Sequence, residues 1–401
     1  MAKTTEPRRK QSFPRELLEQ SKEERLAYFK AYTVAHPYLS QADNAVWNAI
    51  REPVGKLLIF VFGPTGVGKT TLLEHIEKRL MEQALARMQE NQGHLPVARL
   101  NAMAPSSRLF KWADFYTRAL MRVSEPLIDY KINYHALTPI DNEKWQPRVN
   151  PHPRGDATAL QRAWEQAIKY RQMVAILIDE AQHFGKVAKG STLFEQLDHL
   201  KSLAIETQTV HVLAGTYDLP IFRNLNAQLS RRSIDIHFPR YDATKKEDRQ
   251  AFQKVLLSFQ RHLPLEEQPD LIHQWKYCYA HSVGCVGILK GWLTKALAEA
   301  LEEGEKTLST ARLERHAETA DRCDQMISDI EEGEKRMAAS PGADERLLFR
   351  LGLSGRRRAK NGQKQSGETE KQQKAPQSRG ARIGQRNPER DPVKEETGTD
   401  G

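Results

Sequence analysis

The chain has 401 residues, more than one hydrophobic core usually organises, so a prior of about 150 residues per domain predicts two or three structural units. Its net charge of +9 makes a polyanion a reasonable partner, and its three cysteines, which form no CxxC pair, argue against a disulfide framework or a zinc site. Residues 1–18 lack the apolar stretch of a signal peptide and no segment has the roughly 20 apolar residues that cross a bilayer, so we expect a cytoplasmic protein without membrane contact.

The first half of the chain has the pattern of alternating strands and helices. Residues 1–50 predict short helices packed onto a larger body, and the apolar run 57–62 predicts a strand buried on both faces. Further strands are expected at 97–100, 173–178, 210–214 and 234–238, and helices at 71–89 and 157–171. This alternation predicts a parallel sheet with right-handed crossovers, flanked by helices.

Between the first strand and the first long helix stands a glycine-rich octapeptide. Its residues match GxxxxGK[ST] and are Gly63, Pro64, Thr65, Gly66, Val67, Gly68, Lys69 and Thr70, followed by Thr71. Glycines let backbone N–H groups approach phosphate oxygens, and the start of the helix adds its positive end. Lys69 would neutralise the outer phosphates and Thr70 would ligate Mg²⁺. We therefore expect ATP and Mg²⁺ to bind this loop, rather than a chance glycine turn before a helix.

The segment 126–153 is rich in proline, asparagine and aromatic residues and lacks clear periodicity. We expect a long excursion from the core rather than a strand-forming unit. Its role stays open.

Two acids follow the strand at 173–178. In a parallel sheet the carboxyl end of this strand lies beside the phosphate loop, so Asp179 would hold Mg²⁺ and Glu180 would polarise the water that attacks the γ-phosphate. An Asp-Glu pair at a strand end is otherwise an ordinary solvated turn. The occurrence of a phosphate loop upstream favours the catalytic interpretation, and the spacing between the two motifs suits one additional strand between them.

The next strand, 210–214, should lie between the two motif strands and ends near Thr216, which could sense the γ-phosphate or simply form a turn. Arg231 and Arg232 follow a helix-like segment, 224–230. An arginine there can reach the γ-phosphate of a neighbouring subunit, or it can complement the dipole of a helix end. The sequence does not separate the two arginines.

The second half of the chain is helical. Residues 243–303 predict a small all-helical lid, in which Lys290 could reach over the nucleotide or could be a solvated lysine. Residues 307–339 continue as charged amphipathic helix, and beyond Ser354 the composition predicts a disordered tail. The expected domains are an N-terminal helical extension (1–50), a nucleotide-binding core (51–240), the lid (241–303), C-terminal helices (304–353) and a basic tail (354–401).

This set of motifs resembles the AAA+ transposition regulators TniB and TnsC and, more distantly, MuB. The similar stretches are 63–70, Leu177 to His183, Leu213 to Thr216, Gln228 to Arg232, Gly284 to Lys290 and Asp329 to Lys335, so the resemblance covers roughly residues 40–340. It implies an AAA+ P-loop NTPase fold and an ATPase in which Lys69, Thr70, Asp179 and Glu180 act as described. Many AAA+ lids carry arginine where this chain has Lys290, so the resemblance does not imply a direct γ-phosphate contact there.

Members of this family assemble with ATP into rings or filaments on double-stranded DNA, mark a target and recruit a transposase. The resemblance therefore implies double-stranded DNA, a transposase, target-selector proteins and further copies of the chain as partners, with hydrolysis controlling disassembly. Arg231 or Arg232 would act in trans. Arg108 and Lys111 are candidates for phosphate contacts with DNA, and an ordinary exposed amphipathic helix is the alternative for them.

Two other functions fit the same motifs. One is a replication helicase loader or initiator ATPase, which would act on a helicase. The other is a signalling switch that binds nucleotide but turns it over little.

Overall fold

The computed structural model describes residues 12–104, 110–131, 138–140, 144–146, 157–185, 193–219, 233–337 and 342–353. The chain divides into two compact units, Met1–Ala338 and Ala339–Gly401. The second unit contains helix α14, Ala343–Arg350, and the first contains all the other elements named below. The previously expected tail, 354–401, lies outside the described residues.

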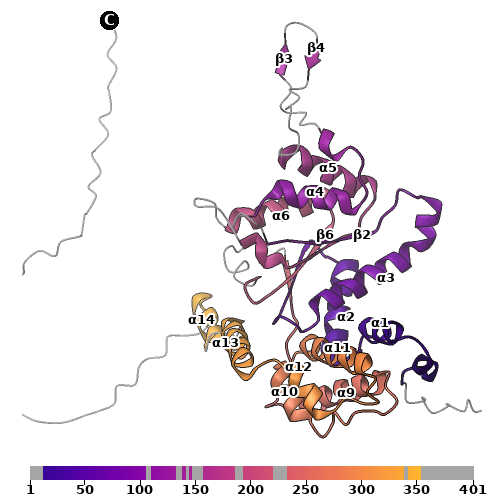
Figure 1. Cartoon of the computed structure of the whole chain (residues 1–401). Coiled ribbons are helices and arrows are strands. Elements are labelled where there is room, and N and C mark those ends of the chain that lie inside the picture. The colour runs from indigo at the N-terminus through magenta and orange to yellow at the C-terminus, as the bar shows by residue number, and fades with distance from the viewer. Residues whose placement is uncertain are drawn as a thin grey trace, which may run out of the picture. The chain divides into compact units, whose positions relative to one another are not determined.

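A five-stranded parallel sheet forms the centre of the first unit (Figure 1). Its order is β2-β5-β6-β1-β7, and the strands are β1 (Leu58–Phe62), β2 (Val97–Asn101), β5 (Ala175–Asp179), β6 (Val210–Gly215) and β7 (Ser233–His237). Every residue of β1, β5 and β6 is buried, as expected for strands covered on both faces. The predicted parallel sheet is confirmed, and β6 lies between β1 and β5 as expected.

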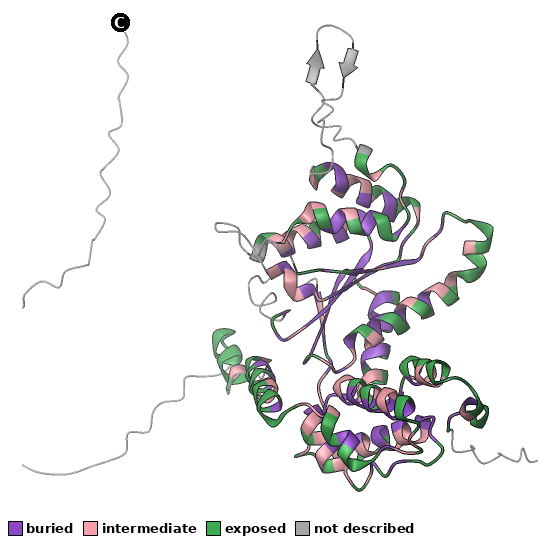
Figure 2. Cartoon of the chain, viewed as in Figure 1, coloured by how far each residue is buried: buried purple, intermediate pink, exposed green. Residues whose placement is uncertain are grey.

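Helices cover both faces of this sheet. On one side α4, α5 and α6 pack together, and α2 and α3 lie on the other (Figure 1). Their bounds are α2 Pro37–Arg51, α3 Lys69–Glu90, α4 Trp112–Arg122, α5 Ala157–Tyr170 and α6 Leu193–Thr207. In α5, for example, Leu160, Trp164, Ala167 and Ile168 recur at helical spacing and are all buried. Figure 2 shows this inward burial and the exposed outer faces.

The lid has a separate hydrophobic cluster. It is built from α9 (Lys246–His262), α10 (Trp275–Ser282), α11 (Val286–Glu303) and α12 (Thr310–His316). Phe252, Val255, Leu256 and Phe259 of α9 are buried in this cluster, and so are Leu289, Trp292 and Leu293 of α11. Ile288 differs, because it packs on the core beside the phosphate loop instead.

The N-terminal segment contributes to both clusters. After the short helix η1 (Arg15–Glu19), α1 (Lys22–Ala31) begins with a capping box between Ser21 and Glu24. Phe29 of α1 is buried in the lid cluster, whereas α2 contributes to the cluster around the sheet. The first fifty residues thus contribute to both the lid cluster and the cluster around the sheet.

The segment 126–153 departs from the prediction. The structure describes a short helix η2 (Ile128–Tyr130) and a two-stranded antiparallel hairpin, β3 (Thr138–Ile140) with β4 (Lys144–Gln146). The expectation that no strands form here was wrong. Strands of three residues are too short to show the alternation on which a sequence-based assignment relies.

Beyond the lid, α13 (Ala320–Met337) returns to the hydrophobic cluster around the sheet. Cys323 and Ile330 are buried in the cluster around the sheet. Gly333 faces Tyr217 so closely that a Cβ there would lie 2.4 Å from the tyrosine ring. Arg240 pairs with Glu334 of the same helix. This contact with the core was not expected from the sequence.

Candidate functional site

The phosphate loop connects β1 to α3. Residues 63–68 form the turn, Lys69 is the first residue of α3, and Gly68 has φ +113°, a conformation that side chains disfavour. The loop therefore presents its backbone at a helix N-terminus, where N–H groups lack partners within the helix. Among its members, Val67 is buried and Thr65 is exposed.

The side chain of Lys69 is buried and folds back over its own loop. Its Nζ donates to the carbonyl oxygens of Gly63 (3.0 Å) and Pro64 (2.8 Å). Burial holds the pKa of Lys69 below its ordinary value, and the carboxylates of Glu180 and Asp179 oppose that shift. The ammonium thus lies in the field of both acids.

Thr70 and Asp179 meet across the gap between α3 and β5. The Thr70 hydroxyl donates to Asp179 Oδ2 at 2.6 Å, and Asp179 Oδ1 accepts the N–H of Glu180 at 2.9 Å. A hydroxyl and a carboxylate are the hard oxygen donors that Mg²⁺ takes, with substrate phosphates and water completing its octahedron. The two side chains therefore fit a magnesium ion shared with a nucleotide.

Glu180 follows β5 in a tight turn with φ 54°, unusual for a residue other than glycine. The turn leads into the short helix η5, Ala181–Gly185, and the side chain of Gln182 in it donates to Glu180 Oε2 at 2.5 Å. The two acids open on a cavity of about 310 Å³, which is lined by Thr70, Arg99, Leu100, Asn101, Arg122, Asp179 and Glu180. The cavity provides room beside both carboxylates.

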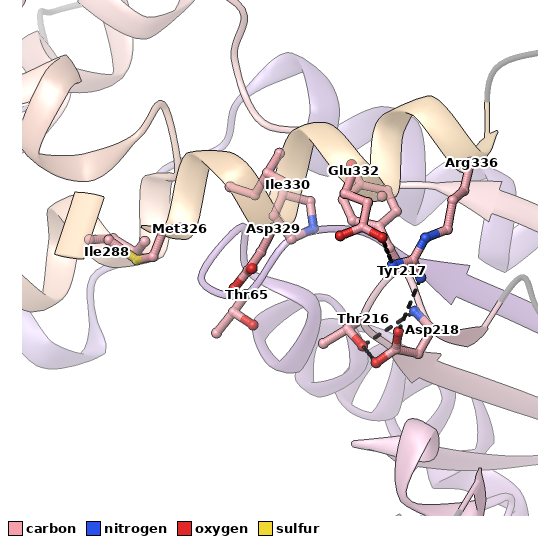
Figure 3. A pocket seen from close by; sticks show the side chains of 12 residues that line it. Thr65, Thr216, Tyr217, Asp218, Ile288, Met326, Asp329, Ile330, Glu332 and Arg336 are labelled. Carbon is pink, nitrogen blue, oxygen red and sulfur yellow. Dashed lines mark hydrogen bonds and ion pairs between the residues drawn. The ribbon is translucent and has the colours of Figure 1, made fainter. Parts of the chain in front are cut away.

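A second cavity is lined in part by the phosphate loop (Figure 3). Its volume is about 360 Å³, and Thr65 of the loop, Thr216 after β6 and one face of α13 line it. The Thr216 hydroxyl donates to Asp218 at 3.3 Å, and Arg336 of α13 lies 3.6 Å from the same carboxylate. The structure thus places Thr216 beside the loop, in a wall that α13 completes.

Residues 51–220 match the model of a family described as an AAA domain. With its five-stranded parallel sheet and its phosphate loop, the chain has the fold of an AAA+ P-loop NTPase domain. The matched residues include the phosphate loop, Asp179 at the end of β5 and Glu180 directly after it.

Three solved structures are similar to the chain. They are the ORC2 protein of Aeropyrum pernix in its ADP form, domain III of the replication initiation protein DnaA of Thermotoga maritima, and Drosophila ORC bound to DNA. Their identities are 15%, 15% and 14%, and their TM-scores are 0.44, 0.39 and 0.40. The matches cover 72%, 76% and 88% of this chain and 71%, 96% and 88% of those chains. No curated protein matches the sequence.

The lid touches the AAA domain at the phosphate loop. The N–H of Gly287 donates to the carbonyl of Gly66 at 2.7 Å, and a Cβ on Gly287 would lie 2.6 Å from that oxygen. Lys290, one turn further along α11, donates instead to the carbonyl of Lys30 in α1 at 2.8 Å, and burial lowers its pKa. The predicted nucleotide lysine therefore holds the N-terminal helix in this structure.

The remaining predicted residues are more dispersed. Thr71 faces a cavity of about 620 Å³ between α3 and the segment that joins α1 to α2. Lys111 is exposed at the N-terminus of α4. Arg108, Arg231 and Arg232 lie outside the described residues.

Sequence reasoning missed two contributors, Gln182 and α13. Gln182 stands two residues after Glu180, but a glutamine after an acid carries no signal of its own. Gly333 did carry one, because an isolated glycine within a helical pattern usually has a packing reason. None of the helices in the described ranges is long and apolar enough to cross a membrane.

Proposed function

We propose that the chain is a magnesium-dependent ATPase that assembles on double-stranded DNA and regulates transposition. The ATPase part is carried by one observation: Lys69, Thr70, Asp179 and Glu180 come together at the phosphate loop of the AAA domain. The transposition part is supported by the sequence resemblance to TniB and TnsC. It extends past the AAA domain into the lid and α13.

ATP would replace contacts that the loop makes with itself. The ammonium of Lys69, which donates to two carbonyls of its own loop, would turn to the β- and γ-phosphates. Thr70 and Asp179 would hold Mg²⁺, which neutralises charge that develops on the phosphates. Thr216 lines a cavity together with Pro64 and Thr65 of the loop and would contact the γ-phosphate through its hydroxyl.

Hydrolysis would proceed from water held by Glu180. The water oxygen attacks the γ-phosphorus as the bond to the bridging oxygen of ADP breaks, and a water proton passes to the carboxylate. Arg231 or Arg232 of a neighbouring copy would supply the positive charge that stabilises this transition state. The products are ADP and inorganic phosphate.

The lid would make oligomer formation depend on whether ATP or ADP is bound. Because Gly287 bonds directly to Gly66, a change in the phosphate loop moves the attachment of α11. The lid would then present a different surface to the next copy with ATP than with ADP. ATP would favour an oligomer on DNA, and hydrolysis would release it.

DNA would bind through phosphate contacts, for which the net charge of +9 is favourable. Arg108 and the exposed Lys111 are the proposed contacts. A transposase and a target selector would then bind the DNA-bound oligomer. The family resemblance supports these partners.

The test is DNA co-sedimentation with ATP, with ADP and without nucleotide, across a salt series. We expect tight binding only with ATP, and we expect Lys69→Ala to lose it. Lys111→Ala should lower the slope of log affinity against log salt by about one. The matched control is Lys254→Ala, an exposed lysine on α9 of the lid, which should leave the slope unchanged.

Electron microscopy of the ATP-bound complex should show ordered oligomers on DNA. Strictly monomeric particles, or DNA affinity indifferent to nucleotide, would contradict the assembly. Retention of a replicative helicase rather than a transposase on the DNA-bound protein would favour the initiator alternative. Hydrolysis that is weak and unchanged by Glu180→Gln would favour a signalling switch.

A further inference from the structure

The main chain of Glu180 is fixed on both sides. Its N–H donates to Asp179 Oδ1 at 2.9 Å, and its carbonyl accepts the N–H of His183 at 3.0 Å. With φ at 54° the residue is confined to a small left-handed region. The backbone therefore fixes the position of the Glu180 Cβ, but the direction of the carboxylate depends on its hydrogen-bond partners.

Gln182 supplies such a bond and connects it to β6. Its amide nitrogen donates to Glu180 Oε2 at 2.5 Å, and its amide oxygen accepts the N–H of Thr216 at 3.3 Å. An ionised carboxylate can only accept and a backbone N–H can only donate, so both bonds form with one orientation of the amide and with no other. The bridge thus always presents a donor to Glu180.

Gly215 leaves room for this bridge. A Cβ at this last residue of β6 would lie 2.4 Å from Gln182 Oε1, a separation that real side chains do not reach. The amide therefore passes close to the end of the strand that carries the Thr216 loop. A side chain at residue 215 would therefore require the amide of Gln182 to shift from this position.

A competing partner for Glu180 lies nearby. The Glu180 carboxylate raises the pKa of the buried Lys69 ammonium more than any other charge does. Without Gln182, attraction to Lys69 would turn the carboxylate toward the phosphate loop. There it would no longer lie where it can accept a proton from water.

We propose that Gln182 is a positioning residue for ATP hydrolysis, which holds the Glu180 carboxylate in place and ties it to the Thr216 loop. This inference rests on the proposed ATPase function. It assigns Gln182 no contact with ATP, so it predicts an effect on turnover and not on nucleotide affinity. Because the bridge ends at the N–H of Thr216, a shift of that loop also shifts the base.

The first experiment measures ATP affinity and steady-state hydrolysis for Gln182→Met, which keeps the length of the side chain and removes the donor. We expect kcat to fall about 10- to 100-fold, the loss that a misplacement of about 1 Å can cause. The Kd for ATP should stay within about twofold. The matched control is Gln161→Met on α5, because Gln161 also donates to a glutamate, Glu165, at 2.8 Å.

The second experiment uses Gln182→Glu and compares its kcat with that of the unsubstituted protein from pH 8 to pH 6. The new carboxylate repels Glu180 when ionised, but when protonated it can donate again. Its kcat relative to the unsubstituted protein should therefore rise as pH falls. A merely structural defect would give a ratio independent of pH.

Glu180→Gln distinguishes a failure of the positioning role of Gln182 from a failure of the ATPase function. If it abolishes hydrolysis while Gln182→Met leaves kcat unchanged, the role of Gln182 is overturned and the ATPase function stands. If Glu180→Gln hydrolyses ATP normally, the proposed function itself fails. A parallel loss of ATP affinity in Gln182→Met, or a flat pH ratio in Gln182→Glu, would also overturn the positioning role.

Discussion

The phosphate loop and the lid are held together in opposite ways. Eight consecutive residues make the loop, and the Lys69 ammonium donates hydrogen bonds to residues only five and six positions earlier in the chain. The lid instead depends on the N-terminal segment: Tyr28 bonds to His262, 234 positions away, and Lys290 bonds to Lys30, 260 positions away. A local motif can be recognised in the sequence, whereas contacts between residues far apart in the chain leave no sequence pattern.

The largest effect should come from removing the N-terminal anchor of the lid. Phe29 is fully buried in the lid cluster, and the centroid of its ring lies 6.0 Å from that of Phe259 in an edge-to-face arrangement. Phe29→Ala should lower the free energy of unfolding by about 3–5 kcal/mol, because it leaves a cavity. Chemical denaturation measures this change, and hydrogen exchange should show weaker protection within 246–303.

Lys30→Ala is the control for that change. Its side chain is exposed, and the carbonyl that accepts the bond from Lys290 is retained. Its stability should stay within about 0.5 kcal/mol of the unsubstituted protein. Equal loss in both variants would show that α1 does not anchor the lid through Phe29.

The corresponding change in the loop is Lys69→Ala. It removes one charged contact to phosphate, worth about 1.5–3 kcal/mol, so the Kd for ATP should rise about 10- to 100-fold. Calorimetry in the presence of Mg²⁺ measures this. Since the lid cluster does not include Lys69, protection within 246–303 should not change without nucleotide. Unchanged ATP affinity would refute the assignment of the loop.

The third effect concerns His211 in the middle of the sheet. Its Nδ1 bonds to the carbonyl of Thr209, and its buried Nε2 has no hydrogen-bond partner within the described ranges. Burial lowers the pKa of His211 to about 4, against about 6.5 in an unfolded chain. Below pH 6.5 the unfolded state binds the extra proton, so stability falls as pH falls from 6.5 toward 4.

From pH 7.5 to pH 5 this histidine should remove about 2 kcal/mol of stability. His211→Leu should flatten that part of the pH profile, as denaturation at each pH would show. His273→Gln, at an exposed histidine outside the sheet, should leave the profile unchanged. An identical pH slope in the protein with and without His211 would exclude this source of acid sensitivity.

The sequence predicted what is local or periodic. It located the five strands of the parallel sheet to within a few residues, because β1, β5 and β6 are short apolar runs and β2 and β7 have apolar residues at alternate positions. It could not place Gln182, whose importance depends on the main chain of Thr216, 34 positions later. It also could not assign residues 1–50 to the lid cluster or to the cluster around the sheet, since an apolar helix face such as that of Phe29 does not indicate which surface it packs against.

The smallest effect should come from the ion pair that joins α13 to the core. Burial lowers the pKa of Arg240, but Glu334, with smaller contributions from Tyr279 and Cys285, raises it, so that this pKa is above its ordinary value. The two side chains meet at 3.2 and 3.4 Å, but Glu334 is 35% exposed, so solvent screens the pair. Glu334→Gln should cost about 0.5–1 kcal/mol, less at high salt.

Glu331→Gln on the same helix is the matched control, because its pair with Lys335 is exposed and longer, at 3.8 Å. It should cost close to nothing in denaturation experiments at low and high salt. A loss from Glu334→Gln that exceeds about 2 kcal/mol and ignores salt would mean that the pair behaves as a buried one. The attachment of α13 would then resemble that of the lid, with long-range contacts that the protein needs in order to fold.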